Sequence, residues 1–388
     1  MNVPKLRFKE FKDEWSTIEL SKISSEISYG MGLPSKEYDG INKYIRITDI
    51  DENTSKYTNK DIVSPDGELE DKYIVKKNDI LFARTGASTG KTYLYDKKDG
   101  KLYYAGFLIK ANIINHDANF IFQQTHTSKY NKWIKVMSMR SGQPGINSQE
   151  YGSYKFSITS KIEEYKISKT LQLLDKKIEL QTNKIEDLKL FKKGLINHII
   201  ENNEIEKISL KNILVEQNNK TSKNNEYEIL SSTSKGIYLQ KDYFNKQAAS
   251  DNNVGYKILK KNQLVLSPQN LWMGNINVNT EYNIGIVSPS YKIFNISNNI
   301  NIDFFNYWIK SPKALFEYKI SSEQGASIVR RNLNMDLFYE IIVDVPRGKL
   351  QNKVGKIIKL LNLNIQYNEF LLQKLSELKK GFMQNMFV

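Results

Sequence analysis

The feature that most constrains this chain is a long helical pattern that occurs twice. Residues 167–197 align without gaps with residues 354–384, at an offset of 187 residues in a chain of 388. In both copies apolar residues recur with a seven-residue period, and both copies contain Lys-Lys-Gly, at 192–194 and 379–381. Apolar heptads sustained over about four repeats on a narrow stripe are typical of a coiled coil. The sequence therefore predicts two long helices, one in each half of the chain.

The predicted seam between the helices has one polar position in each copy. Gln181 and Asn368 occupy equivalent places in the pattern. A polar residue in a coiled-coil core lowers stability but fixes the register of the helices, so we expect the two amides to meet. We expect antiparallel pairing, because it places the two globular segments at opposite ends; two amphipathic helices that each pack on their own domain remain the alternative. The residues expected at this seam are Leu171, Leu174, Ile178, Gln181, Ile185 and Leu188 in the first copy, and Ile358, Leu361, Ile365, Asn368, Leu372 and Leu375 in the second.

Weaker similarities precede each helix and extend the duplication to the rest of the chain. Residues 76–81 (Lys-Lys-Asn-Asp-Ile-Leu) resemble residues 260–265 (Lys-Lys-Asn-Gln-Leu-Val), and Ser-Gly-Gln at 141–143 resembles Gln-Gly-Ala at 324–326. The offsets between these pairs vary, which indicates one plan with loops of different length. Short apolar runs between polar, turn-forming stretches predict strands with a few short helices. We expect an α+β fold with two similar globular domains, residues 1–160 and 204–347, and an antiparallel coiled coil formed by helices at residues 161–203 and 348–388.

Charge and composition narrow the class of partner. Lys and Arg number 57 against 43 Asp and Glu, a formal net charge of +14, which favours a polyanionic partner. The chain has no Cys and only three scattered His, which excludes disulfide scaffolds, thiolate zinc sites and cysteine nucleophiles. No apolar stretch of 18 residues occurs and the first residues are charged throughout, so we expect a cytoplasmic protein with no membrane partner and no bound metal.

One glycine-rich loop resembles a nucleotide-binding loop but has the wrong spacing. Residues 84–92 read Arg-Thr-Gly-Ala-Ser-Thr-Gly-Lys-Thr after a predicted strand. A P-loop requires four residues between its glycines and a helix after its lysine, because that length sets how the amides surround the phosphates. Here Gly86 and Gly90 are one residue too close, and a strand pattern follows Lys91. We interpret the loop as a hairpin suited to phosphate and base-edge contacts; a nucleotide-dependent enzyme that uses Gly86–Thr92 remains an alternative.

The scarce arginines lie in loops whose chemistry suits nucleic acid. Four of the seven, Arg84, Arg140, Arg330 and Arg331, lie in or beside stretches rich in Gly, Ser and Gln. Arg reads guanine with two hydrogen bonds, Asn and Gln read adenine, and Gly lets the backbone approach phosphate. The residues expected to contact DNA are Arg46, Arg84, Thr85, Lys91, Arg140, Ser141, Gln143 and Asn147 in the first domain, and Gln269, Asn270, Trp272, Gln324, Ser327, Arg330 and Arg331 in the second.

Taken together, these features resemble the specificity subunits of type I restriction-modification systems over essentially the whole chain. The residues that carry the resemblance are the opening Pro-Lys-Leu-Arg-Phe at 4–8 with Phe11 and Trp15, the segment from Lys76 into Arg84, the turn at 141–142, and the Lys-Lys-Gly that each helix contains. The resemblance implies two target recognition domains that each read half of a split double-stranded DNA site. It also implies a non-catalytic chain that scaffolds two methyltransferase subunits and restriction/translocase subunits. S-adenosylmethionine, ATP and Mg²⁺ would be bound by those partners, and no cofactor by this chain.

Helix length would then set the spacing of the split site. About 34 helical residues span roughly 50 Å, against roughly 34 Å for one turn of DNA. The two helices would therefore act as a ruler for the spacer between the half-sites. A stand-alone, sequence-specific DNA-binding regulator of similar build remains an alternative; it would bind its site tightly without partners.

Overall fold

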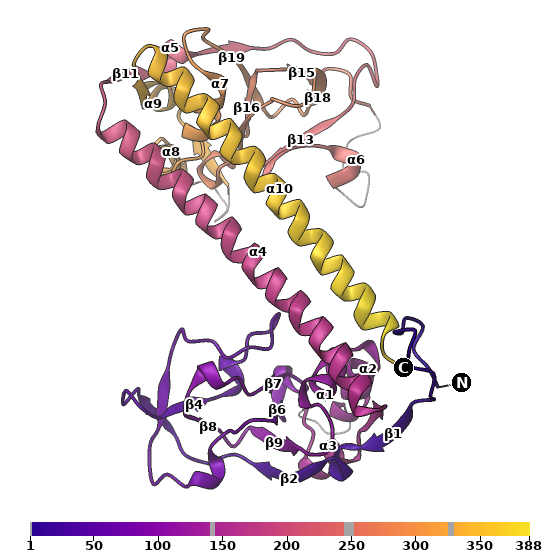
Figure 1. The fold of residues 1–388 in the computed structure, drawn as a ribbon. Helices are drawn as coiled ribbons and strands as arrows, with labels where there is room; N and C mark the ends of the chain where they lie inside the picture. Colours follow the sequence, from indigo (N-terminus) through magenta and orange to yellow (C-terminus); the bar gives the residue numbers. More distant parts are fainter. Residues whose placement is uncertain (1, 140–143, 244–251, 325–329) are drawn as a thin grey trace. The chain divides into compact units, whose positions relative to one another are not determined.

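The chain folds into two compact units, and each unit combines a globular part with portions of the same two helices. The computed structural model describes residues 2–139, 144–243, 252–324 and 330–388. The first unit comprises Met1–Thr182 with Phe370–Val388, and the second comprises Asn183–Glu369. Helix α4 (Lys161–Glu201) and helix α10 (Lys349–Asn385) run through both (Figure 1).

The globular part of the first unit is built on a four-stranded sheet with the order β2-β9-β6-β7, antiparallel throughout. A second, antiparallel pair, β1-β10, leads into α4. A parallel pair is formed by β4 and β8, which both precede α1 in the chain. The bounds are β1 Ser16–Glu19, β2 Ser24–Tyr29, β3 Ser35–Glu37, β4 Lys43–Ile45, β5 Val63–Pro65, β6 Asp79–Ala83, β7 Thr92–Leu94, β8 Leu102–Tyr104, β9 Leu108–Ile113, α1 Ala118–Gln124, α2 Ser128–Ser138, α3 Ser148–Ser153 and β10 Lys155–Ile158.

The second unit repeats this topology. Its four-stranded sheet has the order β12-β19-β16-β17, and the pair β11-β22 leads into α10 as β1-β10 leads into α4. The bounds are β11 Ile205–Ser209, α5 Leu210–Ile213, β12 Leu214–Gln217, β13 Leu230–Thr233, β14 Gly236–Leu239, α6 Gln240–Tyr243, β15 Lys257–Lys260, β16 Leu264–Leu266, β17 Ile276–Val278, β18 Ile284–Val287, β19 Lys292–Ile296, α7 Ile302–Trp308, α8 Pro312–Ile320, β20 Ser322–Gln324, β21 Arg331–Leu333, α9 Met335–Glu340 and β22 Ile342–Pro346.

The short helices of the two units begin with the same kind of cap. The Oδ1 of Asp117 accepts a hydrogen bond of 2.8 Å from the third residue of α1, and the Oδ1 of Asn301 accepts one of 3.1 Å at the start of α7. Thr127 caps α2 and Ser311 caps α8 in the same way. A side-chain oxygen at this position satisfies a backbone N–H that the helix cannot, and contributes about 1 kcal/mol. The duplication is therefore visible in local hydrogen bonds as well as in the sheet order.

Within each unit the two long helices pack antiparallel. In the first unit Ile167 and Leu171 of α4 share a buried core with Met386, which follows α10. In the second unit Ile196 of α4 shares a core with Val354 of α10, so the late part of one helix meets the early part of the other. All twelve residues expected at the seam are buried or half-buried, which confirms the antiparallel coiled coil.

The two seam amides belong to different units. Gln181 lies in the first unit and Asn368 in the second. Asn368 is buried, and its Nδ2 donates to the carbonyl oxygen of Asn364 at 2.7 Å. That the two amides meet stays a prediction.

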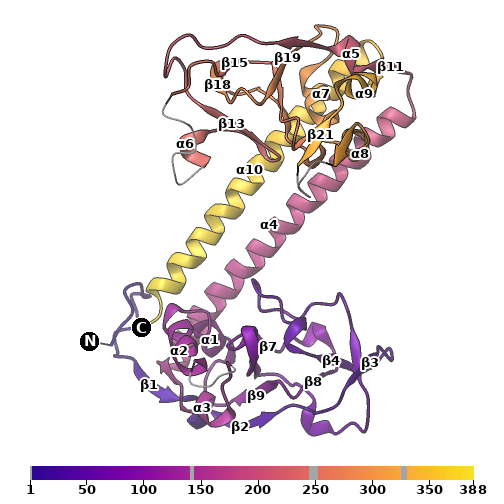
Figure 2. The ribbon, with the colours of Figure 1, turned by 180° about the vertical axis from the view of Figure 1, so that it is seen from behind.

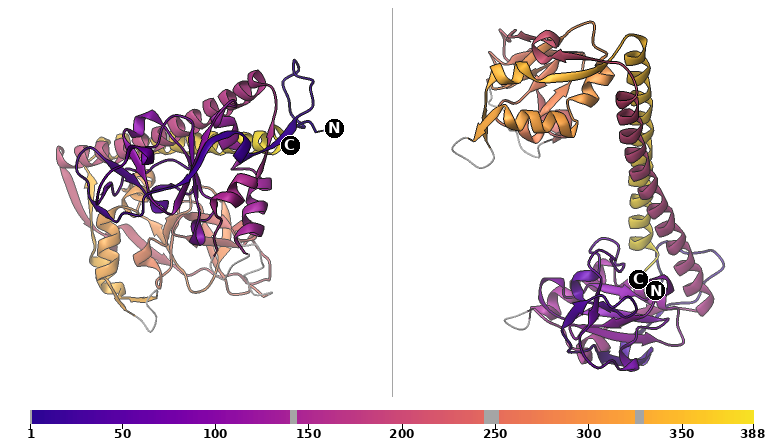
Figure 3. Two further views of the ribbon diagram at one scale, coloured as in Figure 1. Left: turned by 90° about the horizontal axis from the view of Figure 1, so that it is seen from below. Right: turned by 90° about the vertical axis from the view of Figure 1, so that its left-hand side faces the viewer.

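The first unit also joins the two ends of the described chain. The N–H of Leu6 donates to the carbonyl oxygen of Asn385 at 2.8 Å, and the Phe387 ring lies 5.4 Å from the ring of Phe120 in the domain core. Figure 3 shows the N- and C-terminal ends next to one another. Residues 382–388 therefore contribute apolar side chains to the core of the first unit.

Candidate functional site

The glycine-rich loop of the first domain is the turn of a hairpin. The N–H of Ala83, at the end of β6, donates to the carbonyl oxygen of Lys91 at 2.8 Å, and the N–H of Gly90 donates back to Ala83 at 3.0 Å. Lys91 leads directly into β7, which pairs antiparallel with β6. Gly90 has φ +94°, and a Cβ there would lie 2.7 Å from the side chain of Ile134. The expected strand-turn-strand form is confirmed, and the strand-loop-helix that a P-loop requires is not formed.

Backbone bonds join this turn to the segment that precedes α3. Thr85 forms a β-bridge with Gly145, and the N–H of Ile146 donates to the carbonyl oxygen of Arg84 at 2.9 Å. The N–H of Gly86 donates to the carbonyl oxygen of Pro144 at 3.0 Å. Arg84, Thr85 and Asn147, predicted from separate loops, therefore lie at one site. Three further predicted residues, Arg140, Ser141 and Gln143, lie outside the described residues.

The side chain of Arg84 is held by groups that the sequence did not single out. Its guanidinium carbon lies 4.8 Å from the centre of the Tyr29 ring, and its Nη1 donates to the carbonyl oxygen of Gly106 at 3.4 Å. Such cation–π contacts contribute about 0.5–1 kcal/mol at exposed sites. Although burial acts to raise the pKa of Tyr29, the hydrogen bond from the N–H of Ser148 to its hydroxyl lowers it. These contacts orient a half-buried cation beside the loop.

Tyr29 and Phe107 are the site residues that sequence reasoning missed. Gly30 lets the backbone after β2 come close to the backbone after β8, because a Cβ at Gly30 would lie 2.3 Å from the carbonyl oxygen of Ala105. Phe107 follows this contact, is 62% exposed, and accepts the Arg84 N–H on its carbonyl oxygen at 3.0 Å. An exposed ring next to a cationic loop is suited to stacking on a base. The glycines at 30 and 106 are the sequence signal that marks this close approach.

Lys91 and Asn147 are partly committed to the fold. The side chain of Lys91 is 24% exposed, and its Nζ lies 4.0 Å from Glu52. Asn147 caps α3: its Oδ1 accepts from the N–H of Glu150 at 2.9 Å, and its own N–H donates to the Glu150 carboxylate at 2.8 Å. The Asn147 oxygen therefore stabilises the loop that carries the predicted site.

Arg46 lies apart from these loops and is paired within the domain. Its Nε and Nη2 donate to the two carboxylate oxygens of Asp49 at 2.9 and 2.8 Å, and Nη2 also reaches the carbonyl oxygen of Asp61 at 3.3 Å. The Asp49 hydrogen bonds raise the pKa of Arg46. Because the Nε and Nη2 of its guanidinium are engaged within the domain, the geometry supports a structural role, and a DNA contact by Arg46 stays a prediction.

The second domain joins its two predicted segments in the corresponding way. After β16, residues 267–274 form a turn that contains a short 3-10 helix, Leu271–Met273. The N–H of Arg331 in β21 donates to the carbonyl oxygen of Gln269 in this turn at 3.1 Å. Gln324 in β20 pairs with Arg331, and Figure 2 shows β21 beside α8. Four further expected residues complete the set: Asn270 and Trp272, which are half-buried, Arg330, which is exposed, and Ser327, which lies outside the described residues.

The two neighbouring arginines have different surroundings. The Nε of Arg331 donates to the Oγ of Ser322 at 2.9 Å, and its Nη2 donates to the carbonyl oxygens of Ser322 and Lys319. Arg331 therefore ties β21 to the last turn of α8. Arg330, by contrast, has an exposed side chain, so it is the arginine of this pair that is better placed to contact a ligand.

The described residues contain neither a membrane-spanning helix nor a cluster of metal ligands. None of their helices combines the length and the apolar character that crossing a membrane requires. Across the same ranges, no three His, Asp or Glu side chains gather closely enough to hold a metal ion.

Comparison with known proteins gives one family. Residues 13–190 match the model of the type I restriction modification DNA specificity domain. A crystal structure of a type I restriction-modification system S subunit from M. genitalium is similar over 100% of this chain and 99% of that one, with a TM-score of 0.64 and 16% identity. A chain from a structure concerning complex assembly and conformational transition of the type I R-M system is similar over 96% of this chain and 97% of that one, with a TM-score of 0.51 and 11% identity. At these identities the structural likeness shows a common fold.

Proposed function

We propose that the chain is a non-catalytic specificity subunit of a type I restriction-modification system and that it reads a double-stranded DNA site split into two half-sites, because residues 13–190 match the model of that DNA specificity domain. The loops that follow β6 and precede α3 contact the first half-site. The turn after β16 and the β20–β21 hairpin contact the second. In this proposal residues 1–160 and 204–347 are the two target recognition domains, and residues 161–203 and 348–388 are the spacer helices.

One observation carries this proposal: the same loop pairing occurs in both copies. In each domain the turn after β6 or β16, the equivalent strands of the two sheets, is hydrogen-bonded to a later segment that carries arginine and amide residues. The bond joins Ile146 to Arg84 in the first copy and Arg331 to Gln269 in the second. Arg, Asn and Gln side chains read base edges in the major groove, and each good two-bond contact discriminates by about 1–3 kcal/mol. Two such sites on one chain fit two half-sites of different sequence.

The long helices carry apolar side chains that the seam does not use. Leu173 and Leu180 of α4 are 54% and 58% exposed, and the residues 187 positions later, Leu360 and Tyr367, are 66% and 61% exposed. Large exposed apolar side chains outside a core mark interaction surfaces. Because the surface is duplicated, we propose that two methyltransferase subunits dock on it, one for each copy. Restriction/translocase subunits join that assembly in the cytoplasm, and S-adenosylmethionine, ATP and Mg²⁺ are bound by the partners.

Methylome sequencing of cells that express this chain with its methyltransferase subunit tests the proposal. We expect adenine methylation at one split, asymmetric motif. Exchanging residues 1–160 for those of a relative with a different target should change one half of that motif and leave the other half as it was. A motif that is not split, or one that the exchange leaves unchanged, would contradict the assignment; tight, specific binding by the purified chain without partners would favour the stand-alone regulator.

A further inference from the structure

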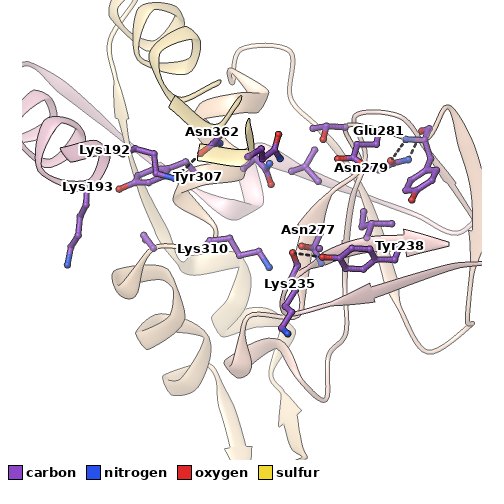
Figure 4. A pocket seen from close by; sticks show the side chains of 18 of the residues that line it. Lys192, Lys193, Lys235, Tyr238, Asn277, Asn279, Glu281, Tyr307, Lys310 and Asn362 are labelled. Atoms are coloured by element: carbon purple, nitrogen blue, oxygen red, sulfur yellow. Dashed lines mark hydrogen bonds between the residues drawn. The ribbon is translucent and has the colours of Figure 1, made fainter. Parts of the chain in front are cut away.

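A cleft of about 670 Å³ in the second unit lies between the long helices and the second domain. Its walls are the Lys-Lys pair of α4, the facing side of α10, the β13–β14 turn, β17 and the turn between α7 and α8 (Figure 4). Four lysines line it, and Glu281 is the only carboxylate among the described residues that do so. The lysines are Lys192, Lys193, Lys235 and Lys310.

Neutral groups accept the hydrogen bonds of the two inner lysines, and the carboxylate that lies near Lys192, Glu369, is paired with Lys189. The Nζ of Lys310 donates to the carbonyl oxygens of Gly274 and Ser234 at 2.6 and 3.1 Å, and burial lowers the pKa of Lys310 to about 8. The Nζ of Lys192 donates to the Oδ1 of Asn362 at 2.8 Å and lies 5.8 Å from the centre of the Tyr307 ring. In the described parts of the chain, no ion pair to a carboxylate is formed by any of the four lysines. Partly buried cations without a counter-ion create a positive potential.

The first copy of the chain has carboxylates where this cleft has amides. At the offset of 187 residues, Lys192 corresponds to Lys379, and Asn362 corresponds to Asp175. In the first unit the Nζ of Lys379 lies 2.6 Å from the Oδ1 of Asp175. The contact between the helices is therefore the same in both copies, but it is an ion pair in the first and a hydrogen bond to a neutral amide in the second.

The next turn of the helix repeats this difference. Glu179 of the first copy corresponds to Gln366 of the second, which lines the cleft. In the first unit the Nζ of Lys56, from the turn between Ile50 and Tyr57, lies 2.5 Å from Glu179. In the second unit the β13–β14 turn brings Lys235 to the cleft that Gln366 lines. Two carboxylates that neutralise the first copy are thus both amides in the second.

From this asymmetry we propose that the cleft of the second unit binds phosphate groups of the DNA backbone, independently of base sequence, and that the first unit has no equivalent. The proposal rests on the DNA-reading function proposed above. Lysine binds phosphate as a point charge, and the side-chain amides of Asn362 and Gln366 can donate further hydrogen bonds.

The position of the cleft favours DNA over a free anion. Lys310 is bonded to the carbonyl oxygen of Gly274, which ends the 3-10 helix of the turn that carries Gln269 and Trp272. The cleft therefore adjoins the turn proposed to read the second half-site. A strand whose bases meet that turn would carry its phosphates toward the lysines, and phosphate contacts fix the position of a protein on the duplex.

The salt dependence of binding tests the proposal with the full chain in complex with its methyltransferase subunits. Each phosphate that a protein neutralises adds about 0.9 to the slope of log affinity against log salt concentration. We expect Lys193→Gln with Lys235→Gln to reduce that slope by about 2 and to weaken binding of target and scrambled duplexes by the same factor, roughly tenfold at low salt. Lys207→Gln with Lys211→Gln, two exposed lysines on β11 and α5, makes the same change in net charge and should leave the slope unchanged.

A second variant converts the cleft to the first copy's chemistry. Asn362→Asp with Gln366→Glu introduces the carboxylates that the first unit already accommodates at these positions, so the fold should be kept. We expect the same loss of slope, with the methylated motif unchanged.

The outcomes separate this inference from the function on which it rests. If the wild-type complex methylates no split motif, the proposed function is overturned. A wild-type complex that methylates a split motif, while both cleft variants keep its full salt slope, would overturn the cleft proposal alone. If inorganic phosphate binds the cleft at constant ionic strength while both cleft variants bind DNA as the wild type does, the cleft is a free-anion site and the DNA assignment is overturned. Loss of methyltransferase binding by the variants would show an acidic protein segment as the occupant, and would likewise overturn the DNA assignment.

Discussion

The Nδ2 of Asn112 donates a hydrogen bond of 2.7 Å to the Oδ1 of Asp79, at the start of β6. The other oxygen of Asp79 accepts from a backbone N–H three residues earlier, also at 2.7 Å. In the second domain Gln263 closes the corresponding turn: its Oε1 accepts from the backbone N–H three residues earlier at 2.7 Å, and its Nε2 donates to Asn295 at 2.8 Å. One domain thus uses a buried carboxylate where the other uses an amide.

Asp79→Asn should stabilise the first domain at neutral pH. Burial raises the pKa of Asp79 above its ordinary 3.8, so the folded state holds a proton that the unfolded chain has already lost as the pH rises past that value. Ionisation therefore costs stability at neutral pH, and an amide avoids that cost, as Gln263 does. We expect a gain of about 1 kcal/mol, the size of one hydrogen bond, that disappears below pH 3.8. Urea unfolding at pH 7 and pH 3.5 checks this; a variant less stable at pH 7 would contradict it.

Arg7→Met should destabilise the first domain strongly. Arg7 donates two hydrogen bonds, of 2.7 and 2.8 Å, to the carboxylate of Glu163 in the first turn of α4, whose side chain is 1% exposed. Removing one partner of a buried pair leaves an uncompensated charge and costs about 3–5 kcal/mol. The control is Arg7→Met with Glu163→Met, which should recover most of the loss in urea unfolding because no charge is left buried.

The Arg7 effect should depend on pH. Burial acts to raise the pKa of Glu163, but hydrogen bonds from Arg7 and Thr159 outweigh it and hold that pKa below its ordinary 4.5. A lowered carboxyl pKa contributes stability that is present above pH 4.5 and is lost as the pH falls through the folded-state value. The difference between the wild type and Arg7→Met should therefore shrink on acidification, and a constant difference from pH 7 to pH 3 would refute this explanation.

The adjacent arginines of the second domain should separate binding from stability. Arg331→Gln removes the bonds to Ser322 and Lys319 and should cost about 1–3 kcal/mol of folding stability. Arg330→Gln, at an exposed position, should lower the melting temperature less than Arg331→Gln does, and should weaken binding to the target duplex by roughly 5- to 150-fold, since a base-reading arginine contributes about 1–3 kcal/mol. Thermal unfolding and DNA titration of the same two variants measure both effects; the reverse assignment would show that Arg331 is the base-reading residue.

Shortening both helices should shorten the spacer of the DNA site. Deleting residues 185–191 from α4 and 372–378 from α10 removes one heptad from each helix, retains both seam amides and keeps the seam in register. Seven residues correspond to about 10 Å of helix, or about 3 base pairs. We expect a motif with a shorter spacer, or loss of methylation where the half-sites can no longer be engaged together. Normal methylation at the original spacing would refute the ruler hypothesis.

The sequence predicted the helices better than the loops, for a physical reason. The seam depends on a period of seven residues that is visible within one segment, so all twelve seam residues could be named before the structure. The site instead depends on strand pairing between distant segments, such as Thr85 with Gly145. Tyr29 was missed because only the sheet order brings its ring beside Arg84.

Residue type alone also did not separate binding arginines from structural ones. Arg46 and Arg331 lie in polar stretches of the sequence, as Arg84 does, yet their donors are engaged by Asp49 and by the carbonyl oxygens at the end of α8. Whether a guanidinium is committed within the fold depends on acceptors that tertiary structure supplies. The cleft lysines show the converse: only the comparison of both copies reveals that Asn362 and Gln366 stand where carboxylates stand in the first.

The composition of the first unit has a consequence for the order of folding during synthesis. Its core includes Met386 and is packed by Phe387, so the ribosome must release the entire second unit before the first can close. Until then, the apolar surface around Phe120 lacks its cover, and an early stop before residue 370 would leave that surface open permanently. A nascent chain of this design depends on residues 382–388 for the completion of its first domain, so it stays exposed to chaperones and proteases until that segment has left the ribosome.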